Sequence, residues 1–174
     1  MKKSRFYVID ALLLIILIFI DQFTKYLAVI NLKDKIPKTL INGVLQLNYL
    51  ENRGAAFGMF QNQKIFFVFI AVVFLAVIFY VIIKTPADKK YMLMHILLVM
   101  IGAGAVGNLI DRVRLNYVVD FIYFSLINFP IFNFADICVT VGTIVFVILI
   151  LFVYKDNDFS FLKLKEDKKI EDKQ

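Results

Sequence analysis

Four long apolar runs, separated by shorter stretches that carry most of the charges, dominate the pattern along the chain. The run from Ile65 to Ile83 contains no charged residue and is long enough to cross a hydrocarbon core of about 30 Å. The other three runs contain few polar residues, so the pattern predicts four membrane-spanning helices. Their expected bounds are about 7–30, 65–83, 91–110 and 134–154.

Two connecting segments are apolar but too short or too broken to span a membrane. Leu40 to Leu50 partly alternates between apolar and polar residues, as half-buried strands do. We expect a small extramembrane β element there, lying on the membrane surface after the first helix. Asn116 to Asn133 is aromatic and contains Pro130, which predicts an interfacial or re-entrant segment between the third and fourth helices. The predicted fold class is therefore an all-α membrane protein with these two additions.

Composition agrees with this prediction. Hydrophobic residues make up 61% of the 174 residues and the mean hydropathy is +0.79, well above the roughly half apolar usage of soluble chains. We expect one integral membrane domain, residues 1–154, followed by a charged tail, residues 155–174, that is disordered or frayed. A cleaved signal peptide is the alternative for the basic start and first run, but no small-x-small cleavage site follows.

The basic residues predict orientation rather than a nucleic-acid partner. Net charge is +6, but most Lys and Arg residues flank apolar runs, where they set topology and meet anionic lipid. Of the 20, 12 lie in the two terminal segments and the 84–90 turn, against 8 elsewhere. The excess predicts that both termini are cytoplasmic and that the opposite helix ends reach the outer face of the membrane.

Several charged and amide side chains interrupt the apolar pattern near those outer ends. A charge at membrane depth costs several kcal/mol unless it is paired or hydrated, so a cluster of charges indicates a functional site. Helix capping is the alternative for single members, with Asn133 or Asp136 beginning the fourth helix and Asp111 ending the third. The predicted topology gathers the set at the outer membrane boundary: Asp21, Asn52, Asp111, Asp120, Asn133 and Asp136. Arg112, next to Asp111, also has the appearance of a site residue.

Asp120 and Asp136 lie at opposite ends of one excursion between the third and fourth helices. Two carboxyl groups brought close together cannot easily both ionise, so one keeps its proton and the other stays charged. Such a pair can act as acid and base on one water molecule and hydrolyse a peptide bond without serine, cysteine or metal. The single His95 and single Cys138 offer no His-based metal site and no internal disulfide. We therefore expect neither a metal nor another cofactor.

Other members of the set are spaced to share helix faces. Asp21 and Lys25 are four residues apart and are predicted to form a mutually neutralised structural pair, with direct substrate contact as the alternative. Asn108, Asp111 and Arg112 also share one face. Asp111 is expected to be structural or to position Arg112.

Five ordered motifs together resemble the bacterial lipoprotein signal peptidase (signal peptidase II) family, over about residues 7–154. Phe134 stands where that family usually has a smaller aliphatic residue. In chain order the motifs are Asp21-x-x-x-Lys25; Asn52-Arg53-Gly54-Ala55-Ala56-Phe57-Gly58; Gly107-Asn108-Leu109-Ile110-Asp111-Arg112; Val118-Val119-Asp120-Phe121; and Phe132-Asn133-Phe134-Ala135-Asp136.

The resemblance implies an aspartyl endopeptidase of the bacterial cytoplasmic (inner) membrane. It would remove the signal peptide from diacylglyceryl-modified prolipoproteins, cutting before the lipidated cysteine, as a monomer in contact with membrane lipid. Carried over by motif, Asp120 and Asp136 would be catalytic. Asn52, Arg112 and Asn133 would contact substrate, Asn108 and Asp111 would support the site, and Asp21 would be structural or near the site, beside Lys25.

Two other classes would use the same carboxylates. A proton- or ion-coupled transporter predicts inverted repeats or broken spans, and the two halves of this chain do not resemble each other. A metal-dependent lipid phosphatase or transferase would need a basic phosphate cradle, for which Arg112 and Arg114 alone are thin evidence.

Overall fold

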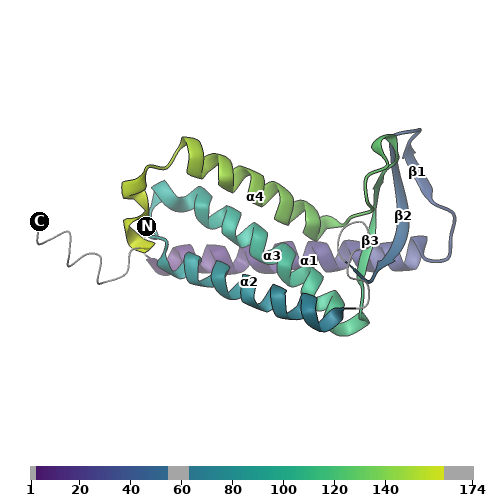
Figure 1. Cartoon of the computed structure of the whole chain (residues 1–174), viewed down its shortest axis with the longest axis horizontal. Helices are drawn as coiled ribbons and strands as arrows, with labels where there is room; N and C mark the ends of the chain where they lie inside the picture. The colour runs from purple at the N-terminus through teal and green to yellow at the C-terminus, as the bar shows by residue number, and fades with distance from the viewer. Residues whose placement is uncertain (1–2, 55–62, 163–174) are drawn as a thin grey trace, which may run out of the picture.

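The computed structural model describes residues 3–54 and 63–162, which form four long helices and a small sheet. The helices are α1 (Lys3–Leu32), α2 (Lys64–Lys84), α3 (Met92–Leu115) and α4 (Phe134–Phe152). They run side by side, with the sheet at one end and the start of α1 and the end of α4 at the other (Figure 1). All four are long and apolar enough to cross a membrane. The predicted fold class is confirmed.

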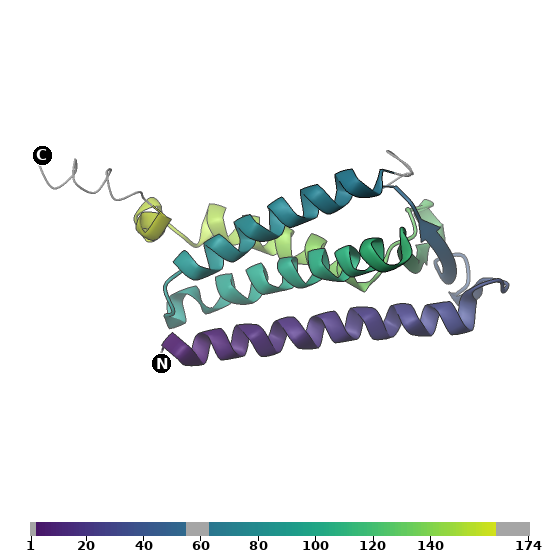
Figure 2. The same cartoon turned by 90° about the horizontal axis from the view of Figure 1, so that it is seen from below.

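Helix α3 is the centre of the bundle. It packs against α1, α2 and α4, and Figure 2 shows it lying between α1 and α2. Its buried residues include Met94, Leu97 and Leu98, whereas α2 buries none of its residues. Large apolar side chains such as Phe19 and Phe69 point outward from α1 and α2 and are 66% exposed. Outward-facing apolar surface of this kind suits contact with lipid chains.

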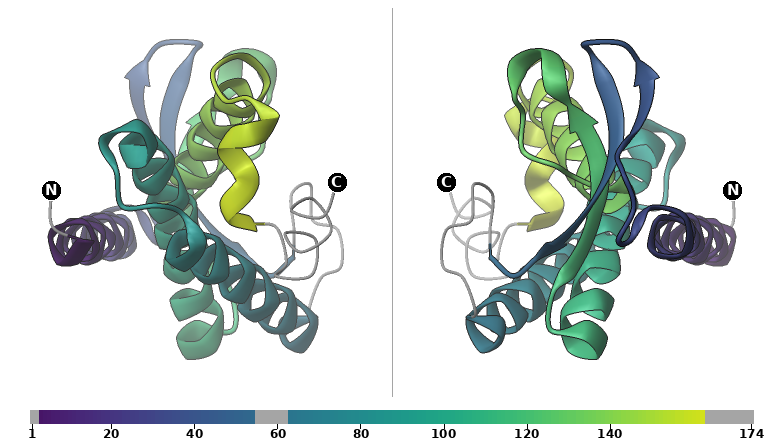
Figure 3. Two further views of the ribbon diagram at one scale, coloured as in Figure 1. Left: turned by 90° about the vertical axis from the view of Figure 1, so that its left-hand side faces the viewer. Right: turned by 90° about the vertical axis from the view of Figure 1, so that its right-hand side faces the viewer.

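The sheet has three antiparallel strands in the order β1 (Lys38–Ile41), β2 (Leu45–Asn52) and β3 (Val118–Phe124). The expected β element after the first helix is therefore present as β1 and β2. Strand β3 crosses the ends of the helices, as the right-hand view of Figure 3 shows. In the register of β2 and β3, Asn52 pairs with Val118 and Leu50 pairs with Asp120.

Strand β3 refines the prediction for residues 116–133. This segment was expected to be interfacial or re-entrant, but its first part joins the sheet and it continues as a short 3₁₀ helix, η3 (Ser125–Ile127). The β-branched and aromatic residues of β3 favour extended structure, and β2 offers an edge with which they pair. A further bridge between Ile122 and Phe132 returns the chain to the start of α4.

The expected disorder of the tail is wrong for its first part. Residues Asp156–Leu162 form a 3₁₀ helix, η4, at the end of the bundle opposite the sheet. Phe159 and Phe161 pack against Tyr91 and Tyr154, and the Tyr154 hydroxyl donates to the backbone oxygen of Lys90 at 2.9 Å. These aromatic contacts order a stretch whose charges alone suggested disorder.

Candidate active site

The candidate site lies where the helices meet the sheet. Asp120 is on β3, and Asp136 is in the first turn of α4. Asn133 is the N-cap of α4 and forms a capping box with Asp136. Its side-chain oxygen accepts from the Asp136 backbone N–H at 3.0 Å, and an Asp136 oxygen accepts from the Asn133 backbone N–H at 3.0 Å. The capping role that the sequence left open is therefore present.

Capping leaves the second oxygen of Asp136 available for a different partner. The side-chain amide of Asn108, on α3, donates to that oxygen at 2.8 Å. Asp136 as a whole is half-buried, in contrast to the fully buried Asn133. Capping and a catalytic role are thus compatible in one residue.

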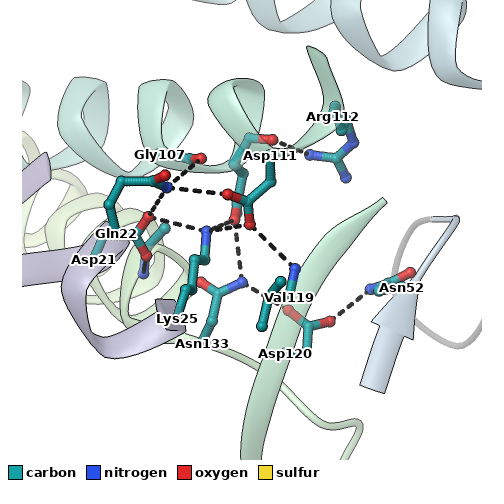
Figure 4. Close-up of polar contacts among 12 residues, drawn as sticks. Asp21, Gln22, Lys25, Asn52, Gly107, Asp111, Arg112, Val119, Asp120 and Asn133 are labelled. Carbon is teal, nitrogen blue, oxygen red and sulfur yellow. Dashed lines mark hydrogen bonds and ion pairs between the residues drawn. The ribbon is translucent and has the colours of Figure 1, made fainter. Parts of the chain in front are cut away.

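Asp120 is only 1% exposed, and side-chain amides from two other elements bind it. Asn133 donates to one of its oxygens at 2.7 Å, and Asn52, at the end of β2, donates to the other at 2.8 Å (Figure 4). Burial, followed by the nearby charge of Asp136, raises the pKa of Asp120 to about 7, and the two amide donors offset this only in part. Asp120 is therefore a carboxyl group that holds its proton into the neutral range.

Asn133 joins the two carboxyl groups. Its side-chain nitrogen donates to Asp120, and its backbone nitrogen donates to Asp136. Both aspartates therefore lie within reach of one residue that is itself fully buried. The excursion from α3 through β3 to α4 closes on itself, as the sequence predicted.

Next to this pair, and linked to it through Asn108, is a buried ionic cluster centred on Lys25 of α1. The Lys25 ammonium group lies 2.9 Å from Asp21 and 3.0 Å from Asp111, and all three side chains are at most 4% exposed (Figure 4). The predicted pair of Asp21 and Lys25 is thus present. Because one cation bridges carboxylates from α1 and α3, none of the three charges is left unpaired in the apolar interior.

The same carboxylates also bind the backbone of the elements that carry the aspartate pair. Asp21 accepts from the backbone N–H of Ala135 in α4 at 3.0 Å. Asp111 accepts from the backbone N–H of Val119 in β3 at 3.1 Å. The ionic cluster therefore fixes the positions of the residues next to Asp136 and Asp120.

Arg112 lies beside the pair rather than in the cluster. Its guanidinium group stacks over the ring of Phe67 on α2 at 4.9 Å and donates to the backbone oxygen of Asn108 at 3.4 Å. It also interacts electrostatically with Asp136 and Asp120. A half-buried cation at this place can face a bound ligand.

All the predicted site residues belong to one connected network, and the structure adds one that the sequence analysis did not single out. The side-chain nitrogen of Gln22 lies 3.0 Å from Asp111, 3.1 Å from Asp21 and 3.2 Å from the backbone oxygen of Gly107. Its position between Asp21 and Lys25 was the available signal. The motif residues Ala55, Ala56, Phe57 and Gly58 lie outside the described residues.

The acidic side chains of the candidate site are not clustered as metal ligands are. Within residues 3–54 and 63–162, no three or more His, Cys, Asp or Glu side chains are gathered closely enough to hold a metal ion. The oxygens of Asp120 and Asp136 instead accept hydrogen bonds from asparagine side chains and backbone N–H groups.

Four membrane-length helices, with two carboxyl groups joined through Asn133 at one end of the bundle, define a membrane protein with a candidate acid–base site. A sequence model of the family described as Signal peptidase (SPase) II matches residues 13–152. The chain belongs to the signal peptidase II family, and it is therefore a membrane peptidase.

Known relatives agree with this assignment. The chain is 48% identical over 136 residues to the lipoprotein signal peptidase of Caldanaerobacter subterraneus subsp. tengcongensis, covering 78% of this chain and 90% of that protein. It is 43% identical over 149 residues to the lipoprotein signal peptidase of Enterococcus faecalis, covering 85% of this chain and 91% of that protein.

Two solved structures, described as bacterial membrane enzymes studied by the in meso method, share the fold. One, at 2.3 Å resolution, has a TM-score of 0.71 and 33% identity, covering 90% of this chain and 92% of its own. The other, at 1.9 Å, has a TM-score of 0.72 and 32% identity, covering 83% and 94%.

Proposed function

We propose that this protein is an aspartyl endopeptidase that removes the signal peptide from diacylglyceryl-modified prolipoproteins by cutting before the lipidated cysteine. The observation that carries the proposal is the joining of Asp120 and Asp136 through Asn133, at 2.7 Å and 3.0 Å. Family membership and the names of the relatives support the substrate class.

The two aspartates have different roles in this proposal. Asp120 holds the proton, since its pKa is raised to about 7, and Asp136 is the base. Asp136 takes a proton from water while the water oxygen attacks the scissile carbonyl carbon. Asp120 gives its proton to the carbonyl oxygen, and a tetrahedral intermediate forms.

Collapse of the intermediate restores both groups. The carbon–nitrogen bond breaks, Asp136 passes its proton to the leaving nitrogen, and Asp120 recovers a proton from the hydroxyl group as the carbonyl reforms. No step needs a metal or a covalent enzyme intermediate. The cycle consumes one water for each peptide bond.

The position of the site suits a lipidated substrate. The acyl chains of the modified cysteine stay in the bilayer, while the peptide bond before it reaches the end of the bundle where β3 crosses. Asn52 and Arg112 are half-buried and are proposed to contact substrate, together with Asn133. The sheet and residues 116–131 are proposed to cover the bound peptide and exclude bulk water.

The remaining proposals concern the whole chain. Residues 1–154 form the peptidase domain, and the protein acts as a monomer in the bacterial cytoplasmic (inner) membrane. Both termini are cytoplasmic, and the site is near the outer face. The excess of basic residues at the termini and in the 84–90 turn supports this orientation.

A gel-mobility assay in detergent tests the function. Purified protein receives a diacylglyceryl-modified prolipoprotein or the unlipidated precursor, with and without a chelator. We expect only the lipidated substrate to be cut, chelator or not, and cleavage to be lost in both Asp120→Asn and Asp136→Asn. Asp156→Asn, an exposed carboxylate in η4, is the matched control and should remain active. Full activity of Asp120→Asn would refute the proposed mechanism.

A further inference from the structure

The orientation of an asparagine side chain is decided by what its two ends meet. An amide oxygen can only accept, and an amide nitrogen can only donate. A neighbour that can only donate must therefore face the oxygen, which directs the nitrogen the opposite way. This rule determines the orientation of three side-chain amides that contact the aspartate pair, those of Asn52, Asn108 and Asn133.

Two of these amides are oriented by the backbone. The oxygen of Asn133 accepts from the Asp136 backbone N–H at 3.0 Å, so its nitrogen points to Asp120. The oxygen of Asn52 accepts from the Gly54 backbone N–H at 3.0 Å, so its nitrogen also points to Asp120. Side-chain substitution cannot remove either of these backbone groups.

The third amide, Asn108, is oriented by two side chains, of which Lys25 makes the shorter contact. Its oxygen accepts from the Lys25 ammonium group at 2.9 Å and from the Asn133 side-chain nitrogen at 3.1 Å. An ammonium group has no acceptor, so the nitrogen of Asn108 must point away from Lys25, and it donates to Asp136 at 2.8 Å. Lys25 is 3% exposed, and Asp21 and Asp111 hold its other two N–H groups.

We propose that Lys25 is a positioning residue for peptide hydrolysis, which acts through Asn108 to keep both oxygens of Asp136 as hydrogen-bond acceptors. This inference rests on the proposed function. Without the ammonium group, the Asn108 oxygen keeps only its longer contact with the Asn133 nitrogen, at 3.1 Å. The amide is then held less firmly and can turn more readily to present its oxygen to Asp136. An acceptor facing Asp136 would favour a proton on it, and a protonated carboxyl cannot take a proton from water.

The position of Lys25 separates this role from substrate binding. Its ammonium group contacts Asn108, Asp21 and Asp111, and of these three side chains Asn108 is the one that donates to Asp136. Loss of a hydrogen bond to a charged group corresponds to about a 10- to 100-fold change in rate. We therefore expect Lys25→Met to lower kcat by about 10- to 100-fold while KM changes by less than about twofold.

A double-mutant cycle tests the path through Asn108. Cleavage rates are measured for wild type, Lys25→Met, Asn108→Ala and the double variant. If Lys25 acts through the amide, Asn108→Ala is costly when Lys25 is present and costs less than about threefold once Lys25 is replaced. If the two losses multiply, Lys25 acts by another route and the inference is overturned.

Lys25→Met leaves two buried carboxylates without their cation, so the cycle is repeated in an Asp111→Asn background. By formal charge, Asp21, Lys25 and Asp111 sum to one negative charge in wild type, and Lys25→Met with Asp111→Asn gives the same formal sum. The amide at position 111 can still accept from the Val119 backbone N–H. Coupling between positions 25 and 108 is expected here too, and additive losses would again overturn the inference.

The two proposals fail in different ways. If the wild-type protein does not cut the lipidated substrate, or if Asp120→Asn stays active, the proposed function fails. If the wild type cuts and the aspartate variants do not, but the cycle is additive or KM rises with kcat unchanged, only the role of Lys25 fails.

Discussion

At the scale of single residues, Asp120 combines almost complete burial with a second carboxyl group nearby. Its pKa is raised to about 7, first by burial and then by Asp136. If Asp120 is the acid, it must be protonated for turnover, so kcat should fall as pH rises above about 7, approaching tenfold per pH unit. The measurement is kcat between pH 5 and pH 9 with saturating lipidated substrate. Activity should recover when the sample returns to pH 6, and a flat profile to pH 9 would exclude Asp120 as the acid.

Asp120 should also make the fold less stable as pH rises. Because its folded pKa is above its ordinary value of 3.8, the folded state binds more protons than the unfolded state between pH 4 and pH 7. Its contribution to stability is therefore present at low pH and is lost as pH rises through about 7. Asn at this position has no charge to bury, but its amide nitrogen must face the amide nitrogen of Asn52 or Asn133. Asp120→Asn should therefore be inactive, and its Tm relative to wild type should rise between pH 5 and pH 8.

Thermal unfolding in detergent at pH 5 and pH 8 checks this expectation. The difference in Tm between Asp120→Asn and wild type should grow with pH, because other carboxyl groups are common to both proteins. Asp156→Asn, which changes an exposed carboxylate, should follow wild type at both values. Equal differences at the two pH values would contradict the raised pKa.

The sequence identifies charged site residues, which are unfavourable in lipid, more readily than the uncharged side chains that contact them. Asp21, Lys25 and Asp111 stand out as charges in apolar runs, and the structure joins them. Gln22 carries no charge and could not be separated from an interfacial glutamine, although it contacts two of those carboxylates. Which way the Asn108 amide turns depends on contacts between three helices, so spacing along one helix could not give it.

At the scale of elements, the close approach of α3 to α4 depends on a small residue. A Cβ placed on Gly104 would overlap the backbone oxygen of Ala135 and lie 2.8 Å from Val139, and a backbone atom cannot move aside. Gly104→Ala should therefore push apart the helices that carry Asn108 and Asp136. We expect a loss of about 1–3 kcal/mol in unfolding free energy, together with reduced kcat.

Gly102→Ala is the matched control, two residues away on the same helix. A Cβ there would meet only the Ile78 side chain, at 3.5 Å, which is ordinary contact. Its Tm and kcat should stay near the wild-type values. If both alanine variants behaved alike, tight packing at Gly104 would not be what holds the site together.

The sheet marks the limit of element prediction from this sequence. Strands β1 and β2 follow each other, and their partial alternation was visible. Strand β3 is far away in the sequence, and it buries four consecutive residues, Val118 to Phe121, so it lacks the alternation that identifies a half-buried strand. Residues 118–124 form a strand rather than a re-entrant segment because they pair with the edge of β2, which is a long-range contact.

At the scale of the whole molecule, the two ends of the bundle differ in chemistry. The end with the sheet holds the aspartate pair and the cluster around Lys25. The opposite end holds the aromatic contacts of η4 and a buried pair of Asp10 and His95, 2.8 Å apart. Because the site is at one end only, the orientation of the bundle decides which side of the membrane the substrate bond must reach.

The excess of basic residues predicts that the end with the sheet faces outward. Single-cysteine variants test this in a Cys138→Ala background, which removes the only native thiol. In intact spheroplasts, a membrane-impermeant maleimide should label Asn42→Cys, in the exposed turn between β1 and β2. Asn157→Cys, exposed in η4 at the other end, should be labelled only after permeabilisation.

The reverse labelling pattern would put the aspartate pair on the cytoplasmic side, and the proposed localisation would be wrong. The native protein serves as the control for background labelling, because Cys138 is only 3% exposed and should react in neither condition. The two test positions are polar and exposed, and they lie beyond opposite ends of the helix bundle. A difference in their labelling therefore reports the side of the membrane rather than burial.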